Sequence, residues 1–317
     1  LQNHKGAIIF THLRRAGGTV LETYVLRPFC KHLEKETHSK AGETYNCREG
    51  GLARHYRMDQ STLARISTEL EHVSLVWRHC PFGVHEIIHQ PFVYITMLRT
   101  PIKRLLSWAA YCIAYSPNNC MTLKFKQNSG SRRRRPKPGV DQARRFYEAR
   151  SELNAKTKLP SFRGLEPFHP PALEFRLDDN YSTRMLCGEP AHDHPVPIGR
   201  EHLACALRNM DQQYAFVGVT ERYEASICVL RELLRIPKKY VKDMRNDKAT
   251  TGSTKRPLPP EMAQVYAPYV ALDNELHAYA HMRLDQDLAQ SDSCSEAFGS
   301  HDHDIGELER FRKILSL

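Results

Sequence analysis

Basic and hydroxyl-bearing residues follow the first apolar segment of the chain and could together bind a phosphate group. Residues 7–10 read Ala-Ile-Ile-Phe, a run typical of a buried parallel strand. The turn after it holds the residues that could contact the anion: Arg14, Arg15, Gly17, Gly18 and Thr19. Glycines let the backbone approach an anion closely, and a helix N-terminus presents free amides to it. We therefore predict a phosphate-binding turn, with Thr19 also capping the following helix.

A second arginine and a serine follow the strongest strand signal, residues 92–98. Arg99 comes directly after this segment, Pro101 suits the first turn of a helix, and Ser107 lies two turns further on. An arginine presents a planar fork to a phosphate, and a serine hydroxyl adds a further bond. The spacing predicts a second phosphate site, distinct from the first.

Two histidines follow a third apolar segment, residues 72–77, and either could act as a general base. His79 and His85 lie just past the predicted strand, where open α/β sheets bind ligands. An imidazole with an ordinary pKa near ~6.5 suits the removal of a proton from a hydroxyl. The chain has 17 histidines, so a plain surface histidine is the alternative interpretation of each.

The elements that position these residues alternate between apolar strand-like runs and helical patterns. Strands are expected at 7–10, 72–77, 92–98 and 214–219, and helices from Pro101, at 202–210, after Tyr223 and at 261–285. The first helix is expected to end near Val25, with loops and a short helix over 27–60. This alternation predicts an α/β fold with a mostly parallel sheet covered by helices on both faces.

Several segments resemble PAPS-dependent sulfotransferases, in particular the Golgi carbohydrate branch that includes heparan-sulfate 2-O- and 6-O-sulfotransferases. The turn is similar to the family's His-x-x-Lys-Thr-Gly-Gly-Thr, and Arg99-x-Pro-x-x-Arg-x-x-Ser to its 3′-phosphate motif. The segments at 79–85, 180–188, 216–221 and 272–276 also resemble the family's pattern. The resemblance covers about residues 7–25, 72–112 and 179–285 and implies the P-loop-like sulfotransferase fold.

The resemblance implies in-line transfer of a sulfuryl group from PAPS to an acceptor hydroxyl, leaving PAP and using no metal. The residues that it places at the nucleotide are Arg14, Arg15, Ala16, Gly17, Gly18, Thr19, Arg99, Ser107, Arg184, Lys255 and Arg256. Arg15 replaces the family's usual lysine, so it can stabilise the leaving group but is a poor proton donor. The 2-O type corresponds best to His79 as the base and the 6-O type to His85, and we place His79 first.

The net charge and the cysteines limit which partners and which cellular compartment we expect. A net charge of +10 favours an anionic partner such as a nucleotide or an acidic glycan. Nine cysteines without a C-x-x-C pair argue against a zinc ribbon. Cys30 with Cys47, or Cys112 with Cys120, could form disulfides in a secretory lumen, whereas Cys228 is expected to be a buried, inert thiol.

We expect one sulfotransferase domain over residues 1–290, with a basic insertion at about 113–172 and a polar tail at 291–317. The Arg132 to Arg135 run in the insertion suits an anionic acceptor. The acceptor implied by the resemblance is a carbohydrate, with a hydroxylated small metabolite as the other option and no nucleic acid. No apolar run is long enough to span a bilayer, and the first residue, a leucine, suggests a missing N-terminal segment. A Golgi lumen is implied, and a cytoplasmic location stays open.

Two other functions remain. One is a non-catalytic anion- or glycan-binding protein on a sulfotransferase-like fold, which the replacement of the family's lysine by Arg15 supports. The other is a nucleotide kinase, which the absence of a Gly-Lys-Ser/Thr loop disfavours.

Overall fold

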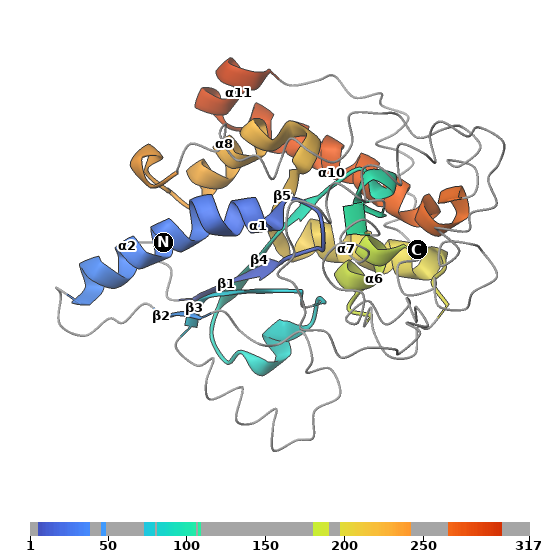
Figure 1. The fold of residues 1–317 in the computed structure, drawn as a ribbon, viewed down its shortest axis with the longest axis horizontal. Helices are drawn as coiled ribbons and strands as arrows, with labels where there is room; N and C mark the ends of the chain where they lie inside the picture. Colours follow the sequence, from blue (N-terminus) through green and yellow to red (C-terminus); the bar gives the residue numbers. More distant parts are fainter. Residues whose placement is uncertain are drawn as a thin grey trace, which may run out of the picture.

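The computed structural model of the chain describes residues 6–38, 46–48, 73–79, 81–105, 107–108, 180–189, 197–241 and 266–299. Within them the chain forms a five-stranded sheet with helices around it (Figure 1). The strands are β1 (Ala7–Thr11), β2 (Asn46–Arg48), β3 (Val73–Arg78), β4 (Phe92–Leu98) and β5 (Tyr214–Val219). They pair in the order β2-β3-β1-β4-β5, and every pair is parallel. The predicted α/β fold with a parallel sheet is confirmed.

The strand order places a topological switch point between β1 and β4. After β1 the chain passes to β2 on one side of the sheet, and after β4 it passes to β5 on the other side. In open parallel sheets, ligands bind outside the carboxyl ends of two such neighbouring strands. The residues that follow β1 and β4 are the predicted phosphate-binding residues, so the fold brings both groups to this edge.

Helices connect the strands and cover the sheet. They are α1 (Gly18–Leu21), the π-helical η1 (Glu22–Leu26), α2 (Arg27–His38), α6 (Tyr181–Cys187), α7 (Arg200–Gln212), α8 (Tyr223–Leu233), α10 (Ala271–Ala289) and α11 (Asp292–Phe298). Short 3-10 helices are η3 (Val84–Ile87), η6 (Thr220–Arg222), η7 (Lys238–Tyr240) and η8 (Ala267–Val270). Residues 101–105 and 107–108 are also helical, as predicted from Pro101.

The first helix is longer than predicted, because α1, η1 and α2 form one helical run from Gly18 to His38. The prediction that it ends near Val25 was therefore wrong. Pro28 has no backbone N–H to donate to a carbonyl one turn earlier. The π-helical segment directly before α2 adjusts the hydrogen-bond pattern at this point, so the helix continues past the proline.

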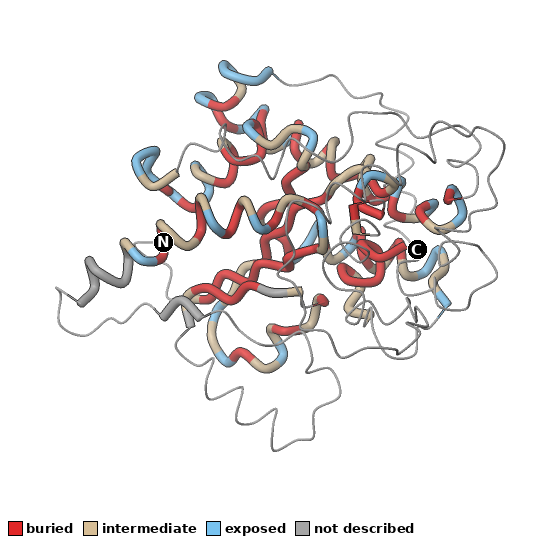
Figure 2. The backbone as a smooth tube through the Cα atoms, in the orientation of Figure 1, coloured by how far each residue is buried: buried red, intermediate tan, exposed pale blue. Residues whose placement is uncertain are grey.

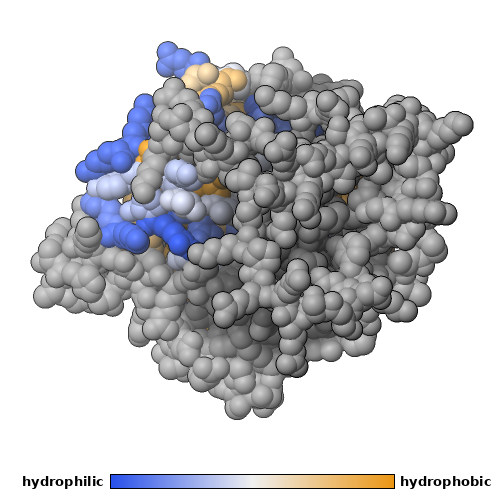
Figure 3. All heavy atoms as spheres, in the orientation of Figure 1, coloured by the Kyte–Doolittle hydropathy of each residue, from blue (hydrophilic) through white to orange (hydrophobic). Residues whose placement is uncertain are grey.

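The core lies where the central strands contact the helices. Phe10, Tyr94 and Phe216 are fully buried, and the strands form the continuous buried region in Figure 2. Leu233, near the end of α8, is 46% exposed. Figure 3 shows a face whose described surface is mostly hydrophilic, with a small apolar area towards the top, where α11 lies in Figure 1.

Helices α6 and α10 cap each other. Asp273, fully buried at the start of α10, accepts hydrogen bonds from the amides of Ser182 and Thr183 and from the Thr183 hydroxyl. In return, Asn180 Oδ1 accepts from the amides of Leu272 and Asp273. The first-turn amides of both helices therefore find acceptors on the other helix. This exchange joins the 180–188 and 272–276 segments.

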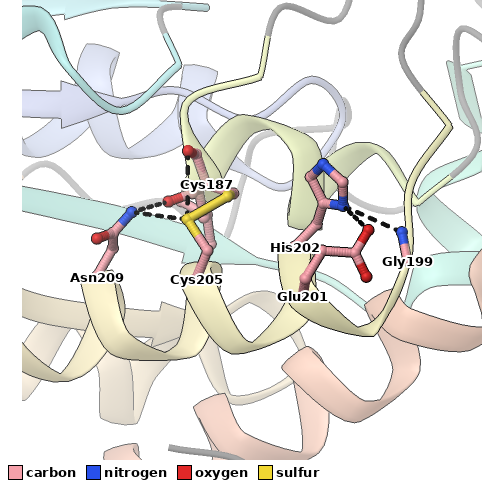
Figure 4. Close-up of a disulfide and its surroundings, with 7 residues drawn as sticks. Cys187, Gly199, Glu201, His202, Cys205 and Asn209 are labelled. Carbon is pink, nitrogen blue, oxygen red and sulfur yellow. Dashed lines mark hydrogen bonds and ion pairs between the residues drawn. A yellow bond between two sulfur atoms is a disulfide. The ribbon is translucent and has the colours of Figure 1, made fainter. Parts of the chain in front are cut away.

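Two disulfides link helices that are distant in sequence. Cys187 at the end of α6 is bonded to Cys205 in α7, beside Asn209, whose amide donates to the Leu186 carbonyl over 2.9 Å (Figure 4). Cys228 in α8 is bonded to Cys294 in α11, so the prediction of an inert Cys228 thiol was wrong. Helix α11 also shows that the predicted polar tail begins with a packed helix, since Cys294 is fully buried. Cys30 is disulfide-bonded as well.

Several expected features fall on other parts of the chain. The basic insertion with its Arg132 to Arg135 run, as well as Cys112 and Cys120, lies outside the described residues. Among the helices that the structure does describe, none is both long and apolar enough to cross a bilayer.

Candidate anion-binding site

The residues after β1 and β4 meet at the switch point. Arg15 Nε donates a hydrogen bond to Ser107 Oγ over 3.0 Å, and Arg99 donates to the Arg15 carbonyl over 3.1 Å. The two predicted phosphate sites are therefore adjacent, because the Arg15 side chain of the first contacts Ser107 of the second. A single anionic ligand at this edge could meet Arg15, Arg99 and the buried hydroxyl of Ser107 together.

The turn at residues 12–17 is held in a specific backbone conformation. Arg15 and Gly17 both have positive φ angles, 62° and 79°. A Cβ atom at Gly18 would lie 2.1 Å from the His12 ring, so only glycine fits there. At the start of η6, the Thr220 hydroxyl lies 2.7 Å from the Ala16 carbonyl and 2.8 Å from the Leu98 carbonyl. Thr220 thus joins the turn to the end of β4.

The turn leads into the helix through Gly17, which is the N-cap and provides no side-chain bond. Thr19 is exposed and lies inside the first turn of the helix, so the prediction that it caps this helix was wrong. The first-turn amides of Gly18 and Thr19 lack acceptors within the helix, as at any helix start. These amides point out of the N-terminal end of the helix, where the helix dipole is positive. This end of the helix therefore favours an anion.

Two further arginines that we predicted at the nucleotide are Arg14 and Arg184. Arg14 stacks on the Trp108 ring, with its guanidinium carbon 4.7 Å from the ring centroid. Arg184, a predicted nucleotide residue, is buried in α6. Burial lowers the pKa of Arg99; the Glu221 carboxylate opposes this change, and the positive charges of Arg15 and Arg104 add to it. The site therefore concentrates positive charge that an anion can neutralise.

Arg104 is the residue that the sequence prediction did not single out. Its side chain is fully buried, with the guanidinium carbon 4.5 Å from the centroid of the Tyr181 ring. Within the described part of the chain, none of its three guanidinium nitrogens has a hydrogen-bond partner. A buried unpaired cation is expensive to maintain, which indicates a role in attracting negative charge. The signal was present, since Arg104 is the second arginine of the Arg99-x-Pro-x-x-Arg motif.

His79 lies against the turn. Its Nδ1 is 2.5 Å from the His12 carbonyl oxygen, and the two imidazole rings are 4.7 Å apart. A carbonyl can only accept, so Nδ1 carries the proton and Nε2 keeps a lone pair. Burial, with a smaller contribution from His79, lowers the pKa of His12 to about 3. His12 is therefore neutral at pH 7.

His85 lies apart from the turn, in an aromatic cluster. Its Nδ1 is 2.9 Å from the hydroxyl of Tyr94, and its ring contacts Phe82 and Phe92. Burial lowers the pKa of His85, and the nearby Glu86 carboxylate opposes this change. Of the two predicted bases, His79 is the one that contacts the anion-binding turn.

A cleft of about 390 Å³ opens at the end of β5, beside the turn. Tyr223 in its wall lies 3.4 Å from where a Gly17 Cβ would be. The other residues that line it are Thr220, Glu221, Arg222, Glu224, Ala225 and Phe298. None of the residues that line this cleft belongs to the turn at residues 12–17.

The remaining predicted nucleotide residues, Lys255 and Arg256, fall outside the described residues. In comparisons with known proteins, no family model and no curated protein matches this chain.

Proposed function

We propose that this protein is a PAPS-dependent sulfotransferase with the P-loop-like sulfotransferase fold. The observation that carries the proposal is the meeting of Arg15, Ser107 and Arg99 at the switch point between β1 and β4. The two sequence motifs that resemble the family's phosphate-binding motifs are about 80 residues apart, yet their side chains are in contact. A nucleotide with phosphates at both its 5′ and 3′ positions has the charge distribution that such a site fits.

The chain's residues divide the work of the proposed reaction. PAPS supplies the sulfuryl group, whose bond to the 5′-phosphate breaks as a bond to the acceptor oxygen forms. The amides of Gly17, Gly18 and Thr19 hold the 5′-phosphate, and Arg15 stabilises the negative charge that develops on it. Arg99 and Ser107 hold the 3′-phosphate, while Arg14, Arg104 and Arg184 add positive charge around it.

His79 is the proposed general base. Its Nδ1 is anchored by the His12 carbonyl, so Nε2 is the atom that takes the acceptor proton. The low pKa of His12 keeps a second positive charge away from His79 at neutral pH. His85 is the second candidate for this role, and its anchor is the Tyr94 hydroxyl.

The net charge of the protein supports the proposed acceptor, and its disulfides support the proposed compartment. A net charge of +10 suits an anionic carbohydrate acceptor, with a hydroxylated metabolite as the second class. The Cys187–Cys205 and Cys228–Cys294 disulfides support an oxidising compartment, as in the lumen of the Golgi.

Calorimetric titration with PAP tests the nucleotide site. We expect the wild type to bind PAP much more tightly than ATP, and Arg99→Ala to lose at least about tenfold in affinity, because a charge-assisted contact is removed. Arg208→Ala, an exposed arginine on α7, serves as the matched control and should bind like wild type. Folded wild-type protein that does not bind PAP would refute the proposal.

Turnover separates the enzyme from the second candidate, a non-catalytic anion- or glycan-binding protein. The support for that candidate is Arg15, because the family that this sequence resembles usually has a lysine at this position. Transfer of labelled sulfate from PAPS to a panel of glycans and phenols should be abolished by His79→Ala. PAP binding without transfer to any acceptor would favour the binding protein instead.

A further inference from the structure

Two histidines of α10 and a glutamate after β5 form a cluster beside the anion-binding site. His277 and His281 are one helical turn apart, so they lie on the same side of α10. Glu221 belongs to η6, directly after β5. None of the three has a role in the proposed sulfuryl transfer.

The three side chains approach one another closely. His277 Nε2 lies 3.3 Å from Glu221 Oε2, and the rings of His277 and His281 are 4.7 Å apart. The potential ligand atoms of all three residues lie within 4.8 Å of one another. For three atoms within 4.8 Å of one another, there is always a position whose distance to each atom is at most 4.8/√3, or about 2.8 Å. Zinc bonds to nitrogen and oxygen are roughly 2.0–2.2 Å long, so small side-chain rotations suffice to reach an ion there.

The pairwise distance also fits the geometry of an ion. In a tetrahedral site with bonds of roughly 2.05 Å, neighbouring ligand atoms are roughly 3.3 Å apart. The distance between His277 and Glu221 has this value. Two imidazoles and one carboxylate, with a fourth position for water, form a ligand set that zinc prefers.

The carboxylate of the cluster is already oriented by a second layer of contacts. Glu221 Oε1 accepts hydrogen bonds from the Thr100 amide over 3.0 Å and from the Thr100 hydroxyl over 2.6 Å. These bonds leave Oε2 directed to His277. Outer contacts of this kind are typical of metal ligands, because they fix the ligand before the ion arrives.

The positive charge next to Glu221 in the sequence is neutralised. Arg222 follows Glu221 in the chain, but its guanidinium is ion-paired with Asp285 over 2.6 Å, one turn beyond His281 on α10. The Asp285 carboxylate thus offsets the repulsion that Arg222 would exert on a bound cation.

We propose that Glu221, His277 and His281 form a binding site for a divalent transition metal ion, with zinc as the best fit. The site is additional to the sulfuryl transfer, which needs no metal. A bound ion would join η6 to α10 and, through Thr100, to the end of β4. It would therefore fix the strand end from which Arg99 reaches the anion-binding turn.

Titration of the metal-free protein with Zn²⁺, followed by calorimetry, tests the proposal. Because other histidines can also bind zinc, the informative quantity is the difference in zinc binding between wild type and each variant. His277→Ala and His281→Ala should each lose one binding event or weaken it at least about 100-fold, since a direct ligand is removed. His89→Ala, which replaces an exposed histidine in the loop between η3 and β4, should retain the wild-type isotherm.

Co²⁺ provides a second readout at the same site. Tetrahedral Co²⁺ absorbs strongly in the visible range, and this band should be present in wild type and His89→Ala but absent in both α10 variants. His277→Gln, which retains a hydrogen-bonding group towards Glu221, covers the case in which His277→Ala does not fold. Equal zinc affinity and equal Co²⁺ spectra in all variants would overturn the proposal. None of these measurements uses PAP, so they stand whether or not the sulfotransferase proposal holds.

Discussion

Replacing Arg104 by methionine tests whether its buried charge serves ligand binding or folding. Arg104 is fully buried, and its nitrogens have no hydrogen-bond partner among the described residues; its close contact is the Tyr181 ring. A desolvated ion without a partner costs several kcal/mol, of which a cation–π contact returns about 2 kcal/mol. Methionine has similar length and no charge. We expect Arg104→Met to leave the free protein as stable as wild type or to stabilise it by about 1–4 kcal/mol.

The same substitution should weaken PAP binding. If the distance between the Arg104 guanidinium and the phosphate is taken as about 8 Å, with an effective dielectric constant of about 20, the charge contributes about 2 kcal/mol. Losing it corresponds to about a thirtyfold weaker affinity. At a PAP concentration 100 times the wild-type Kd, PAP stabilises the wild type by about 2.7 kcal/mol. The same concentration should stabilise Arg104→Met by only about 0.9 kcal/mol.

Urea unfolding with and without PAP measures both quantities in one experiment. Arg104→Lys retains the charge and should keep most of the PAP effect, and Arg208→Met, on the exposed side of α7, should match wild type in both respects. The reasoning is refuted if Arg104→Met destabilises the free protein by more than about 2 kcal/mol while PAP still stabilises it as much as wild type. Arg104 would then be a structural residue.

Three further predictions concern the framework of the site. Gly18→Ala should destabilise the protein by about 1–3 kcal/mol and weaken PAP binding, because the new methyl group would lie 2.1 Å from the His12 ring; thermal unfolding and calorimetry measure the two effects. Asp273→Ala should cost about 3–5 kcal/mol in urea unfolding, since it leaves buried amides of α6 without an acceptor, whereas the exposed neighbour Asn274→Ala should change stability by less than about 0.5 kcal/mol. The pKa of His12 is about 3 in the folded state, below its unfolded value of ~6.5, so the unfolded chain binds the extra proton between these values. Wild type should therefore lose up to about 1.4 kcal/mol per pH unit as the pH falls from ~6.5 towards 3, relative to His12→Gln, and parallel pH profiles of the two would contradict this.

The sequence was informative where a property depends on neighbouring residues. β4 and β5 begin and end where the apolar runs do, and α6 ends at Gly188, which adopts the left-handed conformation expected of a C-terminal glycine. Arg15 and Arg99 were selected because each is a basic residue that follows an apolar, strand-like run, and the structure places both at the same edge of the sheet. Local patterns thus identified most of the elements that the structure describes.

Contacts between distant residues could not be predicted in this way. Whether Arg15 and Ser107 belong to one site or to two depends on the strand order, which local patterns do not reveal. The mutual capping of α6 and α10 pairs Asn180 with Asp273 across 93 residues. The burial of Arg104 and the pairing of Glu221 with His277 likewise depend on helices that return to the sheet from far along the chain.

The Cys228–Cys294 disulfide joins two cysteines that are 66 residues apart in the sequence, so the chain between them forms a covalent ring. This ring includes Lys255, Arg256 and both histidines of α10. A protease that cuts one peptide bond inside the ring leaves the two fragments attached, so the protein migrates as one band without reductant and as two bands with it. A single cut at any peptide bond between Cys228 and Cys294 therefore leaves both halves of the chain joined until the disulfide is reduced.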